Sequence, residues 1–252
     1  RPAKRIILTD EGEALLGRAR VILHEIDQLQ DVIDQTRNRI SGTLRVLAPL
    51  GFGSEHIAPL LAEYADSHAD LSIDLTLSDN PDWMQADKWD VVIYIGHLRD
   101  STLYSTRLAA NPRLLCASPA YLQQQGTPTH PDALQHHHCL VIRENAEDVT
   151  RWTFSHNGDE TTLRITPRLA SNDGRIIKKW ALSGKGIMVR SAWDVSREIR
   201  QGLLVPLLPA FTLPPADIVA LTSLQEKKRL PRTQGFIDLM KHSFRAPPWE
   251  ID

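Results

Sequence analysis

The sequence predicts an α/β fold of two subdomains preceded by one long helix, and three patterns support this prediction. Residues 9–41 repeat apolar side chains every seven positions and contain no Pro. From Thr43 onward, strand-like and helix-like stretches alternate, which is typical of α/β folds with mostly parallel sheets. The alternation restarts after Asn111-Pro112, and a Pro-rich stretch follows at 206–215, so we expect two units joined at these points.

The leading helix is expected to begin with Thr9 as its N-cap and to end at Ser41-Gly42. Its apolar positions alternate spacings of four and three, as in a coiled coil. From Thr9 to Arg39 such a helix measures roughly 45 Å. We interpret it as a dimerising connector, the alternative being that it packs on its own domain. The seam residues are Leu15, Ala19, Ile22, Ile26, Leu29, Ile33 and Ile40.

The first unit is expected to open with a strand at 43–48 that ends before Pro49, followed by a helix. Strict alternation of apolar and polar residues over 71–78 predicts a strand that is covered on one side. A short helix with Pro at its start is expected at 81–88. The continuous apolar run at 90–96 is typical of a strand buried on both faces.

The second unit is expected to repeat strand, turn and helix over 113–126, with a further strand at 136–144. A hairpin is predicted with Asn157-Gly158 at its turn. A helix should follow at 174–186, then a buried strand that leads into another helix. A final strand at 216–224 and a final helix at 230–244 complete the pattern.

Composition narrows the class of protein. The 252 residues carry a net charge of −2, so the chain as a whole is not a general nucleic-acid binder. No apolar run approaches the ~18 residues that a membrane span needs, and we identify no signal peptide. Cys116 and Cys139 lie far apart, so we expect two buried thiols in a reducing compartment.

Motifs for catalysis or metal binding are weak. Three adjacent histidines at 136–138 would point alternately on a strand, so a solvated loop is favoured over a metal site. Ser118 lacks the Gly-x-Ser-x-Gly elbow of a hydrolase nucleophile. The glycines at 51–53 and 184–186 are too few for a nucleotide loop. We therefore expect no enzyme, metal or cofactor.

Several phrases together resemble one family. The start of the chain is similar to the end of a wing strand followed by a linker helix, through Leu8, Thr9, Gly12, Ala19 and Arg20. GTLRVLAP, LSD, IGHLRDS, LCASPAYL, HHCL and SNDG follow in family order. Over essentially its whole length, the chain resembles a LysR-type transcriptional regulator that lacks most of its N-terminal winged helix-turn-helix.

The resemblance implies two Rossmann-like subdomains of periplasmic-binding-protein type. It implies a wing remnant at 1–8, a dimerising linker helix at 9–41, effector-binding subdomain I at 43–111 and 213–246, and subdomain II at 112–212. It further implies a cytoplasmic homodimer or homotetramer that binds promoter DNA through the missing domain and a small-molecule effector between the subdomains. Tyr94 stands where this subgroup often carries Arg.

The effector site is expected beyond the carboxyl ends of strands, where helices begin. Three junctions have this form: 48–54, 117–119 and 171–174. Helix N-termini with one Arg favour an anion, so we expect a small carboxylate, for which Phe52 and Tyr94 suit an aromatic group. The predicted effector residues are Pro49, Leu50, Phe52, Gly53, Ser54, Tyr94, Ile95, Gly96, Ser118, Pro119, Ser171, Asn172, Asp173 and Arg190.

Three alternatives accompany this prediction. Ser118 and Ser171-Asn172 could merely cap their helices, as such residues commonly do. The chain could also be a stand-alone solute-binding module without DNA-linked function, or an α/β enzyme that acts on a small molecule.

Overall fold

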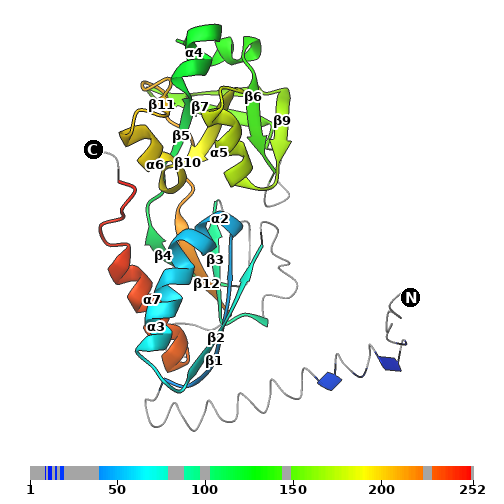
Figure 1. Ribbon diagram of the computed structural model, residues 1–252, viewed down its shortest axis with the longest axis vertical. Coiled ribbons are helices and arrows are strands. Elements are labelled where there is room, and N and C mark those ends of the chain that lie inside the picture. The colour runs from blue at the N-terminus through cyan, green and yellow to red at the C-terminus, as the bar shows by residue number, and fades with distance from the viewer. Residues whose placement is uncertain are drawn as a thin grey trace.

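The computed structural model describes residues 9, 11–12, 15, 18–19, 40–78, 88–96, 103–143, 149–223 and 229–250. Within these residues the chain forms two five-stranded sheets and a two-stranded hairpin. Figure 1 shows the two sheets one above the other along the long axis, each with helices packed on it. We call the lower unit subdomain I and the upper unit subdomain II. The α/β fold of two subdomains is confirmed.

The leading segment is described at a few positions. Thr9 Oγ1 accepts the backbone N–H of Gly12 over 3.2 Å, and residues 11–12, 15 and 18–19 are helical, as predicted. Leu15 is 72% exposed, whereas Ile40 is partly buried against the core of subdomain I. Ala19 is also described, but four seam positions lie outside the described residues: Ile22, Ile26, Leu29 and Ile33. Pairing of the helix with a second copy therefore stays a prediction.

Subdomain I is a mixed sheet with helices packed on it. Its elements are β1 (Gly42–Ala48), α2 (Leu50–Phe52), η1 (Gly53–Ile57), α3 (Ala58–Asp66), β2 (Leu71–Leu77), β3 (Val91–Ile95), β4 (Tyr104–Ala109), β12 (Ile218–Thr222) and α7 (Pro231–Ser243). The strand order is β2-β1-β3-β12-β4. β1 lies parallel to β2 and β3, and β12 runs antiparallel between β3 and β4. The predicted 81–88 helix falls almost wholly outside the described residues.

Local sequence explains how β1 leads into the following helix. Pro49 is extended, with φ −61° and ψ 145°, and it ends the strand as predicted. Helical backbone then runs without interruption from Leu50 to Asp66 through α2, η1 and α3. Gly53 is required on this path because a Cβ there would overlap the Leu77 side chain and the end of β1. The helix start is thereby held close to the end of the sheet.

Subdomain II is a second mixed sheet, in the order β11-β5-β10-β6-β9. Its elements are β5 (Arg113–Ala117), α4 (Pro119–Gln125), η3 (Pro131–His136), β6 (Cys139–Ile142), β7 (Arg151–His156), β8 (Asp159–Arg164), β9 (Pro167–Ser171), α5 (Gly174–Leu182), β10 (Ile187–Ser191), α6 (Ala192–Arg200) and β11 (Val205–Pro206). Side chains of α5 and α6 form one core with β5, β6 and β10. The β7–β8 hairpin packs into a second core with strands of the same sheet.

The hairpin turn is confirmed. Asn157 and Gly158 both adopt positive φ, 51° and 91°, which a two-residue type I′ turn requires. The flanking strands pair in register from Arg151 opposite Arg164 to His156 opposite Asp159.

The expectation of mostly parallel sheets is wrong, because the chain passes between the subdomains twice. β5 and β12 are the first long strands after these crossings, and each starts at the joint and runs away from it. Both are therefore antiparallel to their neighbours. β1, β2 and β3 are parallel to one another, as are β6, β9 and β10, and both sets end at the joint.

Two further predictions concern the cysteines and membrane-spanning segments. Cys116 and Cys139 are free, buried thiols, as expected. Burial raises the pKa of each thiol to about 12. Within the described part of the chain, no helix is both long and apolar enough to cross a membrane.

Candidate functional site

A cleft lies between the subdomains, where strands of both sheets end. Its walls include the last residues of β1, β3, β6 and β10. The space between the walls, including the part open to solvent, measures about 700 Å³. This volume is in the range of protein pockets that bind small molecules.

The wall from subdomain I contains a helix start without a cap. Pro49 is the N-cap of the helix that begins with α2, and no side chain caps its first turn. The backbone N–H groups of Leu50 and Gly51 therefore have no acceptor within the helix. Both residues line the cleft. Such a helix start carries partial positive charge and favours a negatively charged group.

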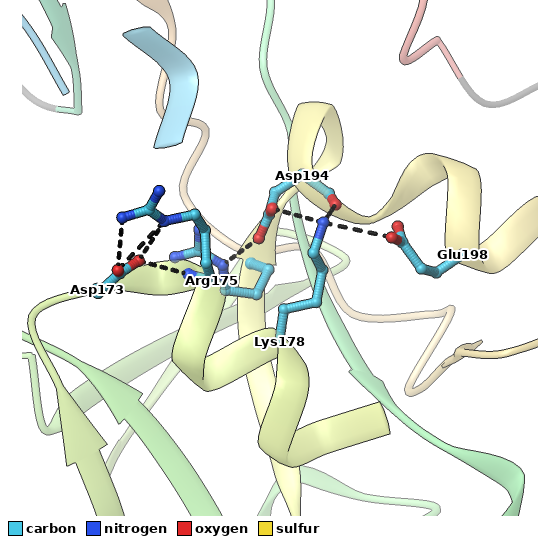
Figure 2. Close-up of polar contacts among 6 residues, drawn as sticks. Asp173, Arg175, Lys178, Asp194 and Glu198 are labelled. Atoms are coloured by element: carbon cyan, nitrogen blue, oxygen red, sulfur yellow. Dashed lines mark hydrogen bonds and ion pairs between the residues drawn. The ribbon is translucent and has the colours of Figure 1, made fainter. Parts of the chain in front are cut away.

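The wall from subdomain II contains the start of α5, which is capped. Asp173 Oδ1 accepts the backbone N–H of Arg175 over 2.9 Å, and both carboxylate oxygens accept from the Arg175 side chain at 2.7–3.2 Å. Figure 2 shows the two side chains facing one another at this helix start. The hydrogen bond from Arg175 lowers the pKa of Asp173, although burial acts in the opposite direction. A carboxylate of the chain itself therefore occupies this helix start.

Behind this wall, four charged side chains tie β10 to α5 and α6. Arg190 Nε donates to Asp194 Oδ2 over 2.7 Å. Lys178 Nζ lies 3.0 Å from Asp194 Oδ1 and 3.3 Å from Glu198 Oε1. Figure 2 shows the Lys178 side chain between these two carboxylates. Burial would lower the pKa of Lys178, but the two carboxylates outweigh it and raise that pKa. Asp194 is 4% exposed, and its buried carboxylate is paired with these two cations.

The side chains of Asn111 and Trp193 connect the segments that meet at the joint beside the cleft. Asn111 Nδ2 donates to Ser191 Oγ over 3.0 Å and to the Ala216 carbonyl over 2.8 Å, which links both crossings of the chain to the end of β10. Trp193, at the start of α6, packs edge-on against Phe52 of subdomain I with ring centroids 5.3 Å apart. Both aromatic residues line the cleft, so they connect its two walls directly.

The charged side chains among the described residues that line the cleft are both arginines. Among the described residues that line it, Arg175 and Arg190 are cationic and none is Asp or Glu. Arg190 is buried, whereas the Arg175 side chain is 52% exposed at the mouth. Apolar residues such as Leu47, Ile93 and Ile142 form much of the remaining lining. The arrangement suits a small molecule with an anionic end and a hydrocarbon part.

A family model described as the LysR substrate binding domain matches residues 37–245. The chain belongs to the LysR family. The HTH-type transcriptional regulator DmlR of Escherichia coli (strain K12) is 34% identical to this LysR chain over 214 residues, which cover 85% of the chain and 70% of DmlR. The HTH-type transcriptional activator TtdR of the same strain is 33% identical over 211 residues, covering 84% and 68%.

Solved structures are similar to this LysR chain as well. The CrgA regulatory domain of Neisseria meningitidis has a TM-score of 0.69 at 26% identity, covering 81% of the LysR chain and 99% of that domain. The full-length virulence activator AphB of Vibrio cholerae has a TM-score of 0.73 at 22% identity, covering 97% and 83%. The resemblance to LysR-type regulators and the periplasmic-binding-protein-like fold are thereby confirmed, and residues 37–245 match the effector-binding domain.

The cleft of the LysR chain brings together half of the residues predicted for the effector site. The predicted residues that line it are Pro49, Leu50, Phe52, Tyr94, Ile95, Asn172 and Arg190. Gly53, Ser54, Gly96, Ser171 and Asp173 lie within two positions of lining residues in sequence but do not line the cleft themselves. The Tyr94 side chain packs in a cluster with Leu47 and Val219. Binding by any of these residues stays a prediction.

Ser118 and Pro119 are not brought to the cleft, so that part of the expected site is wrong. β5 runs antiparallel to β10, with Arg113 opposite Ser191, so its carboxyl end lies at the far end of the sheet. α4, which starts at Pro119, lies at the top of Figure 1, away from the joint. Ser118 occupies the N-cap position, but its hydroxyl makes no hydrogen bond, so the capping alternative fails there too. At α5, the cap is Asp173 rather than Ser171 or Asn172.

Sequence reasoning missed the polar or aromatic lining residues Ser78, Arg175 and Trp193, and also the apolar lining residues Leu47, Ile93 and Ile142. Arg175 and Trp193 follow strand ends at the starts of α5 and α6, and that position is the signal that could have identified them. Ser78 is the polar residue directly after the alternating strand 71–77, so it lies at the carboxyl end of that strand.

The three consecutive histidines do not converge. His137 Nδ1 lies 3.1 Å from the Tyr121 hydroxyl, and the His138 ring lies 2.7 Å from Arg168 Nη1. His136 is exposed at the end of η3. The described residues contain no group of three or more His, Cys, Asp or Glu side chains that could hold a metal ion.

Proposed function

We propose that the chain is the effector-sensing and oligomerising part of a DNA-binding regulator, and that the cleft binds a small carboxylate. The observation that carries the proposal is the kind of charged side chain that lines the cleft. Arg175 and Arg190 line it, no acidic side chain among the described residues does, and the α2 helix start offers uncapped N–H groups. Guanidinium and backbone N–H groups are the donors that carboxylates prefer in proteins.

The rest of the lining supports a small organic anion over an inorganic one. Leu47, Leu50, Phe52 and Ile93 supply apolar surface to hold a hydrocarbon chain or ring. Because Arg190 is buried and bound to Asp194, we expect it to orient the ligand rather than move with it. The exposed Arg175 can rotate from Asp173 toward a ligand at small cost.

DNA binding is proposed to reside upstream of the chain. The relatives DmlR and TtdR are HTH-type regulators, and the basic residues at 1–8 suit a wing that lies along phosphates. We propose about 55–60 further residues that form a winged helix-turn-helix, in the usual plan of such domains. A longer chain should then bind promoter DNA in the cytoplasm, and the present chain should bind it weakly.

Assembly is proposed to use two interfaces. The heptad seam of residues 9–41 would pair two helices, and the edge of subdomain I at 53–67 and 71–77 would pair two effector domains. Two different two-fold interfaces generate a homotetramer as a dimer of dimers, whereas one alone gives a homodimer.

The competing functions are a solute-binding module without DNA-linked function and an enzyme. The relatives DmlR and TtdR are transcriptional regulators, which favours regulation, so we propose that the chain is not an enzyme. A gel-shift assay of the longer chain, run beside an activity screen of the present one, separates these possibilities. Sequence-selective DNA binding supports the regulator, and turnover without DNA binding contradicts it.

A thermal-shift screen tests the chemical class of the ligand. Matched sets of small carboxylates, neutral alcohols and amines of similar size should be compared at equal concentration. The proposal predicts that stabilising compounds come from the carboxylates, and that one present at a hundred times its Kd adds about 2.7 kcal/mol of stability. Stabilisation by amines or neutral compounds, with none by carboxylates, contradicts the proposal.

A further inference from the structure

The segment after α7 returns to the joint between the subdomains. α7 ends at Ser243, and residues 245–250 then run as turns to Trp249, which is 2% exposed. The Trp249 indole Nε1–H donates to the carbonyl of Ala110 over 3.3 Å, at the first crossing of the chain. A buried tryptophan removes roughly 150–250 Å² from water, so this contact anchors the segment firmly.

Trp249 packs on subdomain I next to the cleft. Its ring centroid lies 5.8 Å from that of Phe52 and 5.0 Å from that of His56. Phe52 and His56 in turn contact Trp193 of subdomain II, at 5.3 and 5.7 Å. The four rings form one cluster, and Phe52 and Trp193 are also walls of the cleft.

The same segment is bonded to subdomain II. Arg200, at the end of α6, donates through Nη2 to the Pro248 carbonyl over 3.1 Å and through Nη1 to the Glu250 carbonyl over 3.4 Å. Residues 245–250 therefore contact both subdomains and the first crossing between them.

Residues 245–250 form a third connection between the subdomains, in addition to the two crossings of the chain. Two neighbouring crossings act as a hinge and leave rotation about one axis free, which is the usual route by which a two-lobed binding protein opens. Beside the first crossing, residues 245–250 join α6 to the α2–η1 helix, and this third connection opposes that rotation. We propose that residues 245–250 form a strap that fixes the angle between the subdomains, with Trp249 and Arg200 as its two anchors. The strap positions Phe52 and Trp193, and it acts whatever ligand the cleft takes.

Electron–electron distance measurements on spin-labelled protein test the strap without any ligand. Labels on Ser105→Cys in β4 and Gln124→Cys in α4 report the subdomain angle from exposed sites, and Cys116 and Cys139 are buried away from the label. Excess unlabelled chain suppresses distances between chains. Arg200→Ala removes one anchor, and Arg197→Ala makes the same change on an exposed turn of the same helix without touching the strap.

The proposal predicts the same narrow distance distribution for the native chain and Arg197→Ala. Arg200→Ala should broaden it and shift its mean, and Trp249→Ala should broaden it further. If Trp249→Ala does not fold, the comparison of Arg200→Ala with Arg197→Ala decides alone. An unchanged distribution in Arg200→Ala overturns the proposal, as does equal broadening in both arginine variants. Because no ligand is present, neither result depends on the effector proposed above.

Discussion

The guanidinium of Arg190 lies directly against the backbone of Gly174 at the start of α5, so close that a Cβ at residue 174 would overlap its Nη2 atom. The contact joins the end of β10 to the first turn of a helix that lines the cleft. Gly174 does not adopt positive φ, so the requirement for glycine comes from this contact and not from the backbone.

Gly174→Ala should therefore destabilise the protein by about 1–3 kcal/mol, the usual cost of overpacking a buried contact. Without the contact, Ala at a helix start would be neutral or favourable, because it restricts the unfolded chain. In an Arg190→Met background the loss of stability caused by Gly174→Ala should vanish, since the flexible thioether can move aside. Urea denaturation of Gly174→Ala, Arg190→Met and the double mutant measures the effect. If Gly174→Ala loses the same stability in the native and Arg190→Met backgrounds, the loss arises from the backbone conformation and not from the contact with Arg190.

Asp194→Ala should cost about 3–5 kcal/mol, because it leaves Arg190 and Lys178 without their shared buried carboxylate. The matched control is Asp217→Ala, which breaks the pair formed by Arg107 Nε and Asp217 Oδ2 at 2.6 Å. That pair is 63% and 34% exposed, so its loss should cost about 0–1 kcal/mol. Similar costs for both variants, measured by chemical denaturation, would show that burial of the network is unimportant.

Asp173 should make stability depend on pH in the acid range. Its pKa lies below the ordinary 3.8 in the folded state, mainly because the Arg175 side chain donates to it. A lowered pKa stabilises the fold above the unfolded value, and this contribution is lost as the pH falls through the folded value. The native chain should therefore gain stability over Asp173→Asn as pH rises through this range.

The acid dependence has an internal control. Arg175→Gln removes the main cause of the pKa shift but leaves the carboxylate in place as the cap of α5. In that background the pH-dependent difference between Asp and Asn at residue 173 should shrink. Urea denaturation at a series of pH values, together with carboxyl carbon chemical shifts of Asp173, measures both quantities. A difference that is unchanged by Arg175→Gln would refute the assigned cause.

Features of the fold that depend on neighbouring residues could be predicted from the sequence, whereas features that depend on contacts between distant segments could not. β1, β2, β3 and the β7–β8 hairpin follow from side-chain periodicity and from Pro49 and Asn157-Gly158, which are local signals. Strand direction is set by the two crossings, so nothing near Ser118 indicates that β5 runs away from the joint. Trp193 looks like any apolar residue at a helix start, and only the packing of α6 against subdomain I shows its role.

Charge in the predicted heptad seam should reduce the assembly by one step. Ile26→Asp with Leu29→Asp would place carboxylates between two helices, where they cannot be solvated. Gln28→Asp with Gln30→Asp adds the same charge at neighbouring positions outside the seam and should leave the assembly unchanged. Light scattering measures the mass of each. An unchanged mass in the seam variant would show that the helix does not pair.

The central claim is that the effector binds in the cleft between the subdomains, and its location can be tested directly by calorimetry. The most stabilising carboxylate from the screen should be titrated into the native chain, Asn172→Trp and Gln124→Trp. Asn172 is exposed at the cleft, so a tryptophan there should fill the space without disturbing a core, whereas Gln124 is exposed on α4 at the far end of subdomain II. The account predicts that Asn172→Trp loses binding while Gln124→Trp binds as the native chain does. Native affinity in Asn172→Trp, in a variant that is fully folded, would contradict it.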